Sequence, residues 1–126
     1  MHYTDQPSRL EAHKDLSNGV MLFEGGGIVT EAMVDQAFSR VKNAPTTPPH
    51  VLIDLRNVAG YDANAVTRAE HLLAGVVAAG VRRIAFVADS PLLHTTAQVL
   101  SSGTSAAVRG FHHEPTARAW LQRRAP

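Results

Sequence analysis

The sequence predicts a single α/β domain with a mostly parallel sheet of about five strands and four helices. Short apolar runs alternate along the chain with segments whose apolar residues recur every three or four positions. Two of these runs, residues 51–55 and 84–88, are almost continuously apolar, which is typical of parallel strands covered on both faces. The chain has 126 residues, close to the commonest size of one domain and too few for two ordinary ones.

Residues 10–23 are predicted to form an antiparallel hairpin ahead of the parallel strands. Apolar and polar residues alternate from Leu10, and a second apolar run follows. Asn18-Gly19 lies between them and readily takes the positive φ angles of a tight turn. The three glycines at 25–27 match no phosphate-binding pattern and are interpreted as a turn. The polar residues 1–9 are predicted to be a flexible N-terminus.

The first two helices are predicted from their caps and their apolar spacing. Thr30 is a suitable N-cap for a helix that the proline-rich residues 43–50 end. A second helical stripe of apolar residues covers 64–79, and Gly80 is expected to close that helix because glycine accepts the required backbone conformation. Residues 56–63, between the preceding strand and this helix, are predicted to be a loop.

The remaining elements continue the alternation. Ser90-Pro91 is a favourable start for a third helix, with serine as N-cap and proline at the first helical position. Residues 107–111 are predicted to be the last strand, and Glu114-Pro115 opens the last helix. The predicted order is therefore β-β-α-β-α-β-α-β-α, which implies right-handed parallel crossovers. Residues 10–122 form the predicted domain, and 123–126 form a C-terminal tail.

The composition argues against several classes of function. The chain has no cysteine, which rules out disulfides, thiolate metal sites and cysteine nucleophiles. Its net charge of +1 and its scattered lysines and arginines argue against nucleic-acid binding. The N-terminus lacks the pattern of a signal peptide, and the longest nearly apolar stretch, residues 72–81, is half a membrane span. We therefore expect a soluble cytoplasmic protein without membrane insertion.

Polar side chains are expected to converge where two neighbouring parallel strands end, because the loops that follow them share one edge of the sheet. This edge would gather Asp62, Asp89, Ser90 and His94. Ser90, His94 and Asp62 could be drawn as a hydrolytic triad, but no G-x-S-x-G pattern surrounds the serine. A helix-capping serine and a surface histidine explain the same residues more simply, so no catalytic residue is predicted.

The seven histidines do not have the spacing of a metal site. His112 and His113 would point to opposite sides of an extended chain, and the sequence contains no H-x-x-x-H pair. Solvated surface histidines are therefore expected, and neither a metal nor a cofactor is predicted.

Asp54 is the one acid inside an apolar strand, and we expect it to be structural. A buried carboxylate must be paired or hydrogen-bonded, because desolvating it alone is costly. The acidic pair and the lysine that accompany a phosphorylated receiver aspartate are missing from this sequence. Asp54 is therefore expected to bond to backbone N–H groups, to Arg56 or to Arg83.

Several segments, taken in order, resemble STAS domains, in particular the SpoIIAA-like branch typified by bacterial anti-sigma-factor antagonists. The strand at 51–58 and the helix start at 61–66 are similar to the central motif of that family. Residues 27–31, 82–87 and 111–121 resemble its entry to the first helix, a later strand and the closing helix. The resemblance covers residues 10–122 and rests on the order and spacing of these motifs.

The resemblance implies function through contact with a partner protein. Typical members bind a kinase-like anti-sigma factor, which phosphorylates a serine or threonine where the helix after the central strand begins. The matching stretch here, Asp62-Ala63-Asn64-Ala65, has neither hydroxyl nor glycine, and Thr67 lies one turn into the helix. A phosphate would add roughly two negative charges at a helix N-terminus, and this stretch has no residue to accept it. By this resemblance, the partner-binding residues are Arg56, Tyr61, Asp62, Ala63, Asn64 and Val66.

The leading hypothesis is a cytoplasmic, non-catalytic STAS-type module that binds a partner protein through residues 56–66. Some SpoIIAA-like proteins are compared with lipid-carrying CRAL-TRIO domains, so one alternative is a binder of a small apolar, lipid-like ligand or a weak enzyme. That alternative places its site at the edge formed by Asp62, Asp89, Ser90 and His94. A further alternative is a homodimer subunit with a scaffold role.

Overall fold

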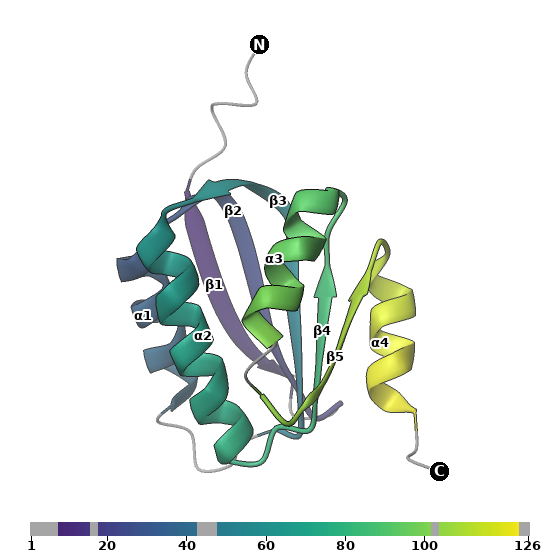
Figure 1. Cartoon of the computed structure of the whole chain (residues 1–126). Helices are drawn as coiled ribbons and strands as arrows, with labels where there is room; N and C mark the ends of the chain where they lie inside the picture. The colour runs from purple at the N-terminus through teal and green to yellow at the C-terminus, as the bar shows by residue number, and fades with distance from the viewer. Residues whose placement is uncertain (1–7, 16–17, 43–47, 102–103, 124–126) are drawn as a thin grey trace.

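Five strands form one sheet, and four helices pack against it (Figure 1). The computed structural model describes residues 8–15, 18–42, 48–101 and 104–123. Residues 1–7 of the predicted flexible N-terminus and residues 124–126 of the predicted tail lie outside the described part of the chain.

The strands lie across the sheet in chain order. They are β1 (Arg9–Asp15), β2 (Val20–Val29), β3 (His50–Tyr61), β4 (Arg83–Val87) and β5 (Ala107–Phe111). β1 is antiparallel to β2, and the other neighbouring strands are parallel. The helices are α1 (Glu31–Lys42), α2 (Ala63–Ala78), α3 (Pro91–Ser101) and α4 (Glu114–Gln122). The predicted fold class and order of elements are confirmed.

Connectivity decides which face of the sheet each helix covers. Helices α1, α2 and α3 each connect one parallel strand to the next, always in the same direction across the sheet. Right-handed crossovers that advance in one direction place their helices on one face. Helix α4 follows the last strand and is not a crossover, so it packs on the opposite face.

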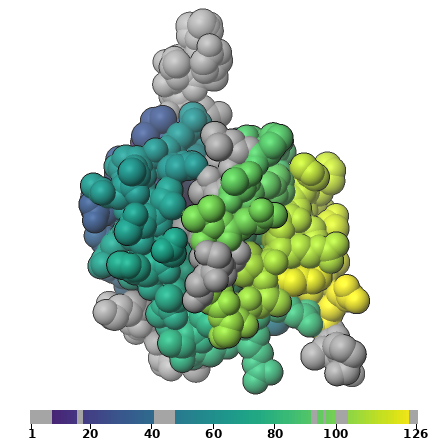
Figure 2. All heavy atoms as spheres, in the orientation of Figure 1, coloured from purple at the N-terminus to yellow at the C-terminus, as the bar shows by residue number. Residues whose placement is uncertain are grey.

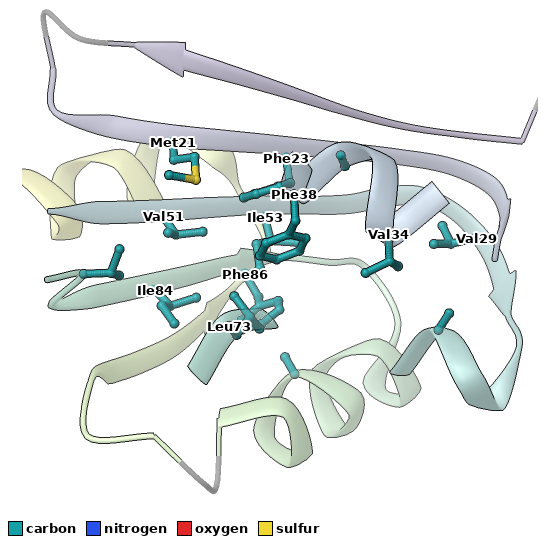
Figure 3. Packing of buried hydrophobic residues seen from close by; sticks show 14 residues of the cluster. Met21, Phe23, Val29, Val34, Phe38, Val51, Ile53, Leu73, Ile84 and Phe86 are labelled. Atoms are coloured by element: carbon teal, nitrogen blue, oxygen red, sulfur yellow. The ribbon is translucent and has the colours of Figure 1, made fainter. Parts of the chain in front are cut away.

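The core accordingly has two parts. The larger part lies beneath α1, α2 and α3 and contains Phe23, Phe38 and Phe86 (Figure 3). The rings of Phe23 and Phe38 stack with their centroids 4.7 Å apart. The smaller part packs Leu52 against Leu121 of α4 and its neighbours. Successive side chains of a strand point to opposite faces, so the continuous apolar run of β3 supplies both parts.

The strands β2 and β3 run on past the end of β4. The last residue pair between β3 and β4 is Asp54 with Val87, whereas the β2–β3 pairing continues to Val29 with Tyr61. In Figure 1, β3 curves away from β4 before α2 begins. We call the extra length the overhang, which consists of residues 25–29 of β2 and 55–61 of β3.

Two sequence predictions are wrong in this region. The glycines at 25–27 are not a turn but part of β2, and most of the predicted loop at 56–63 is strand β3. The β2–β3 register shifts between Glu24 and Gly26 and again between Gly27 and Ile28, and Gly27 has a φ of 62°. Such irregularities bend a strand and favour glycine where φ is positive. The glycines therefore bend β2 rather than end it.

Candidate functional site

Asp62 connects the overhang to the start of α2. Its side chain accepts a hydrogen bond from the backbone N–H of Ala65 at 2.7 Å, which makes it the N-cap of the helix. Its own backbone N–H donates to the carbonyl oxygen of Val29 at 3.2 Å. These two bonds fix the position of the first turn of α2 relative to the end of β2.

The N-cap and the first turn of α2 carry three exposed residues of the predicted partner-binding set. Asp62, Ala63 and Asn64 are all exposed, whereas Ala65 is buried. In Figure 2, α2 lies open at the surface on the left of the view. Thr67, one turn further, donates its hydroxyl to the carbonyl oxygen of Ala63 at 3.3 Å. This turn therefore offers a small, uncharged surface beside a capping carboxylate that is already in use.

The sequence predictions missed an exposed apolar residue on the overhang. Ile28 is 49% exposed and pairs with Gly60 of β3, one position before the pair of Val29 and Tyr61. A Cβ on Gly60 would lie only 3.2 Å from Cδ1 of Ile28, so the isoleucine side chain lies over this glycine. The only signal in the sequence was an apolar residue directly after three glycines, which had been assigned to a turn.

Arg56 lies in a different environment from the other predicted partner-binding residues. Its Nε and one terminal nitrogen donate to the two carboxylate oxygens of Asp54, at 3.0 and 2.7 Å. Its backbone N–H donates to the same carboxylate at 3.0 Å. Asp54 is 6% exposed, so the expectation of a buried, hydrogen-bonded carboxylate is confirmed, and of the three expected partners the structure gives it Arg56 and a backbone N–H group. Arg83 instead donates to the carbonyl oxygens of Trp120 and Arg123.

The Asp54–Arg56 pair is the first part of a chain of ion pairs that reaches α4. Arg56 also contacts Glu114 at 3.0 Å, and the other oxygen of Glu114 accepts from Arg118 at 2.8 Å. Arg118 in turn lies 3.8 Å from Asp15 of β1. Glu114 and Arg118 are four residues apart on α4, so the network joins this helix to the sheet.

Burial and ion pairing act in opposite directions on the Asp54 carboxyl. Burial raises its pKa, but the hydrogen bonds and the charge of Arg56 outweigh this effect and hold the pKa below its ordinary value. The same pairing raises the pKa of Arg56. Both groups are therefore charged at neutral pH, and we assign Arg56 mainly to positioning α4.

The structure does not bring together the four residues of the predicted ligand edge. Asp54 lies beside the end of β4, and Asp62 is eight residues further along the chain, at the far end of the overhang. His94 instead has Nε2 2.9 Å from the carbonyl oxygen of Ala88. Its ring also packs edge-on against His112, with centroids 4.8 Å apart. β3 is longer than its apolar core suggested, and it carries Asp62 well beyond Asp54, the last β3 residue paired with β4.

Two of the predicted partner-binding residues turn toward the interior. Tyr61 and Val66 are half-buried and line a cavity of about 80 Å³ between the overhang and the helices α1 and α2. A second, larger cavity of about 390 Å³ lies between α1 and α2, where the Arg68 guanidinium bonds to Asp35. None of the residues of the predicted ligand edge lines either of these two cavities.

Within the described parts of the chain, no three histidine or acidic residues cluster as metal ligands would. None of the helices described is both long and apolar enough to cross a membrane.

One family model and two solved structures resemble this chain. A family model described as SpoIIAA-like matches residues 20–122. An uncharacterized protein of the DUF3478 family with a SpoIIAA-like fold, from Shewanella loihica PV-4, is 18% identical, with a TM-score of 0.66 over 92% of this chain and 94% of its own. The anti-sigma factor antagonist SpoIIAA in its unphosphorylated form is 13% identical, with a TM-score of 0.65 over 92% of this chain and 98% of its own. No curated protein sequence matches the chain.

Proposed function

The chain belongs to the SpoIIAA-like family, and from this we propose that it is a non-catalytic regulatory module that binds a partner protein around the N-terminus of α2. The observation that carries the proposal is the small exposed first turn of α2, which follows the central strand. We call this turn the partner surface, and it consists of Ala63 and Asn64.

The partner surface has features of a protein contact. Ala63 and Asn64 are both exposed and carry no charge. The buried centre of a protein interface is depleted in charged residues, so such a turn is suited to a protein contact. The cap at Asp62 holds the turn in place before any partner arrives, which lowers the ordering cost of binding.

We further propose that this contact is not switched by phosphorylation. Residues 62–66 contain no hydroxyl group. Thr67 is the first hydroxyl in the helix, and it is bonded to the carbonyl oxygen of Ala63 one turn back. A phosphate at this position would have to break that bond and would lie beyond the orphan N–H groups of the helix N-terminus.

Catalysis and ligand binding at the strand edge have little support. Asp62 lies at the end of the overhang, whereas Ser90 and His94 follow the shorter strand β4, so we do not propose the triad. The proposal therefore assigns no chemical step to these residues. It places the protein in the cytoplasm, with a partner protein as its ligand, and a second copy of the same chain is one candidate partner.

The test is affinity capture from the source cell with mass spectrometry, using variants matched on one helix. Asn64→Tyr adds a bulky side chain to the partner surface, and Ala78→Tyr adds the same side chain at the exposed other end of α2. We expect a protein that is captured by the wild type and by Ala78→Tyr but is lost with Asn64→Tyr. Identical sets of captured proteins for all three forms would refute the proposed surface. If the only protein lost with Asn64→Tyr is a second copy of this chain, the protein is a homodimer that uses this surface.

A further inference from the structure

The strand β1 forms one edge of the sheet, and β5 forms the other (Figure 1). In the described part of the chain, β1 pairs with β2 on one side, and its other side faces no strand. The outer side of an edge strand presents backbone N–H and C=O groups that can pair with a strand of another chain. Which strand pairs there depends on the side chains that β1 carries.

The two faces of β1 carry different kinds of side chain, because successive residues of a strand point to opposite faces. Leu10 and Ala12 pack against the larger part of the core. The other face carries a row of four polar residues, which are Arg9, Glu11, His13 and Asp15. The side chains of Glu11 and His13 are 45% and 53% exposed, and Nε2 of His13 lies 3.6 Å from a carboxylate oxygen of Glu11. These side chains are therefore open to a strand added at this edge.

The polar row is complementary to a second copy of itself. A twofold axis at Ala12 would run two β1 strands antiparallel and would pair all seven residues of each. Arg9 would then lie opposite Asp15 of the second copy, and Glu11 opposite His13 of the second copy. Opposite charges in directly opposed positions stabilise an antiparallel pair, and imidazole donates an N–H to a carboxylate even when it is neutral. By symmetry, each of these favourable pairs would form twice.

Neighbouring registers lack this complementarity. An axis at Glu11 would place that carboxylate opposite its own copy, and an axis at His13 would place Glu11 opposite Asp15 of the second copy. Like charges in directly opposed positions are destabilising. The other edge of the sheet differs in the same way, because full-length antiparallel pairing of two β5 strands (residues 107–111) would place Arg109 opposite its own copy. The charges thus favour one edge and one register.

We propose that the protein forms a twofold dimer in which β1 of one copy pairs antiparallel with β1 of a second copy about Ala12. The pairing joins the two sheets into one continuous sheet. A single pair of seven-residue strands is a small contact, and interfaces that bury less than about 1,200 Å² are typically weak. The dimer should therefore form as the protein concentration rises. It leaves the partner surface on α2 unused, so Asn64→Tyr should not change it.

The first test is sedimentation velocity of the whole chain over a series of concentrations. The wild type should approach twice the mass of one chain. His13→Glu opposes Glu11 of the second copy with a like charge at two symmetric positions, and it should weaken the dimer about tenfold. Adding Glu11→Lys to this variant opposes unlike charges again and should restore the dimer. His71→Glu, the same substitution at an exposed position of α2, should leave it unchanged. A wild type that keeps the mass of one chain at every concentration would overturn the proposal, and so would equal weakening by the single and double variants.

A second measurement on the wild type decides the question even where a variant does not fold. The backbone amide resonances are followed by NMR as the protein is concentrated. Those of β1 should shift, whereas those of β5 and of the partner surface should not. Shifts at Ala63 and Asn64 instead would place self-association on the partner surface and contradict the proposal. Equal shifts at both edges of the sheet would show non-specific association and would also contradict it.

Discussion

Arg56 is the main neighbour that allows the buried Asp54 to stay charged inside the sheet. Three of its N–H groups, two on the side chain and one on the backbone, donate to the Asp54 carboxylate. A buried ion pair adds little net stability to the fold. Removing one partner, however, leaves the other charge buried and unpaired, which is costly. Removing Arg56 should therefore destabilise the fold much more than removing an ordinary surface arginine.

We predict that Arg56→Leu lowers the free energy of unfolding by about 3 kcal/mol at pH 7, because it leaves the Asp54 carboxylate buried without its ion partner. Arg68→Leu is the matched control. It removes an ion pair with Asp35 in which both side chains are more than 40% exposed, and it should lower the free energy of unfolding much less than Arg56→Leu does. Urea unfolding measures both changes, and equal losses would contradict the assignment.

The cost of Arg56→Leu should also depend on pH. In the wild type the pKa of Asp54 lies below its ordinary value of 3.8, so this carboxyl stabilises the fold above that pH. Its contribution is lost as the pH falls through the lowered pKa. In the variant, burial raises the same pKa, and the carboxyl is protonated in acid at little cost. The difference in free energy of unfolding between the wild type and the variant should therefore shrink as the pH falls below 3.8, and a constant difference would argue against a charge effect.

The role of Asp54 could be reasoned from the sequence because one acid in an apolar run has few acceptable environments. The sequence narrowed the hydrogen-bond partners of Asp54 to Arg56, Arg83 or backbone N–H groups but did not distinguish among them. Choosing it required the position of α4, because Arg83 bonds instead to carbonyl oxygens at the end of that helix.

At the scale of elements, the start of α2 depends on one side chain. We predict that Asp62→Ala lowers the free energy of unfolding by about 1 kcal/mol, because the N–H of Ala65 loses its capping acceptor. Asp62→Asn should retain most of the stability, because asparagine caps as well as aspartate. Urea unfolding distinguishes the two, and equal losses would show that the cap is not the cause.

Helix ends were predicted better than strand ends. Gly80 was expected to close α2, and the structure bears this out: Gly80 has a φ of 125°, its N–H donates to Val77, and the N–H of Val81 donates to Val76. The ends of β2 and β3 were missed because glycines and the polar Arg56-Asn57 interrupt the apolar pattern there. Those residues remain in strands because each strand supplies hydrogen bonds to the other.

At the scale of the whole molecule, the alternation of strands and helices was enough to predict the fold class and the mostly parallel sheet. The position of the functional site was harder to predict, because it depends on which strand ends lie side by side. The assumption that strands β3 and β4 end together gathered Asp62 with His94, and the overhang separates them. The same overhang supplies part of the lining of the apolar cavity, which no pattern in the sequence indicated. Figure 3 shows Phe23, Phe38 and Phe86 of this lining together in the core.

The central claim is that the partner binds at the first turn of α2, and the most direct test is the dissociation constant of the captured partner. Titration calorimetry would compare the wild type with Asn64→Tyr and Ala78→Tyr. The account predicts that binding is weakened by about tenfold or more for Asn64→Tyr and is unchanged for Ala78→Tyr. The same affinity for all three proteins would show that the partner binds elsewhere on the molecule.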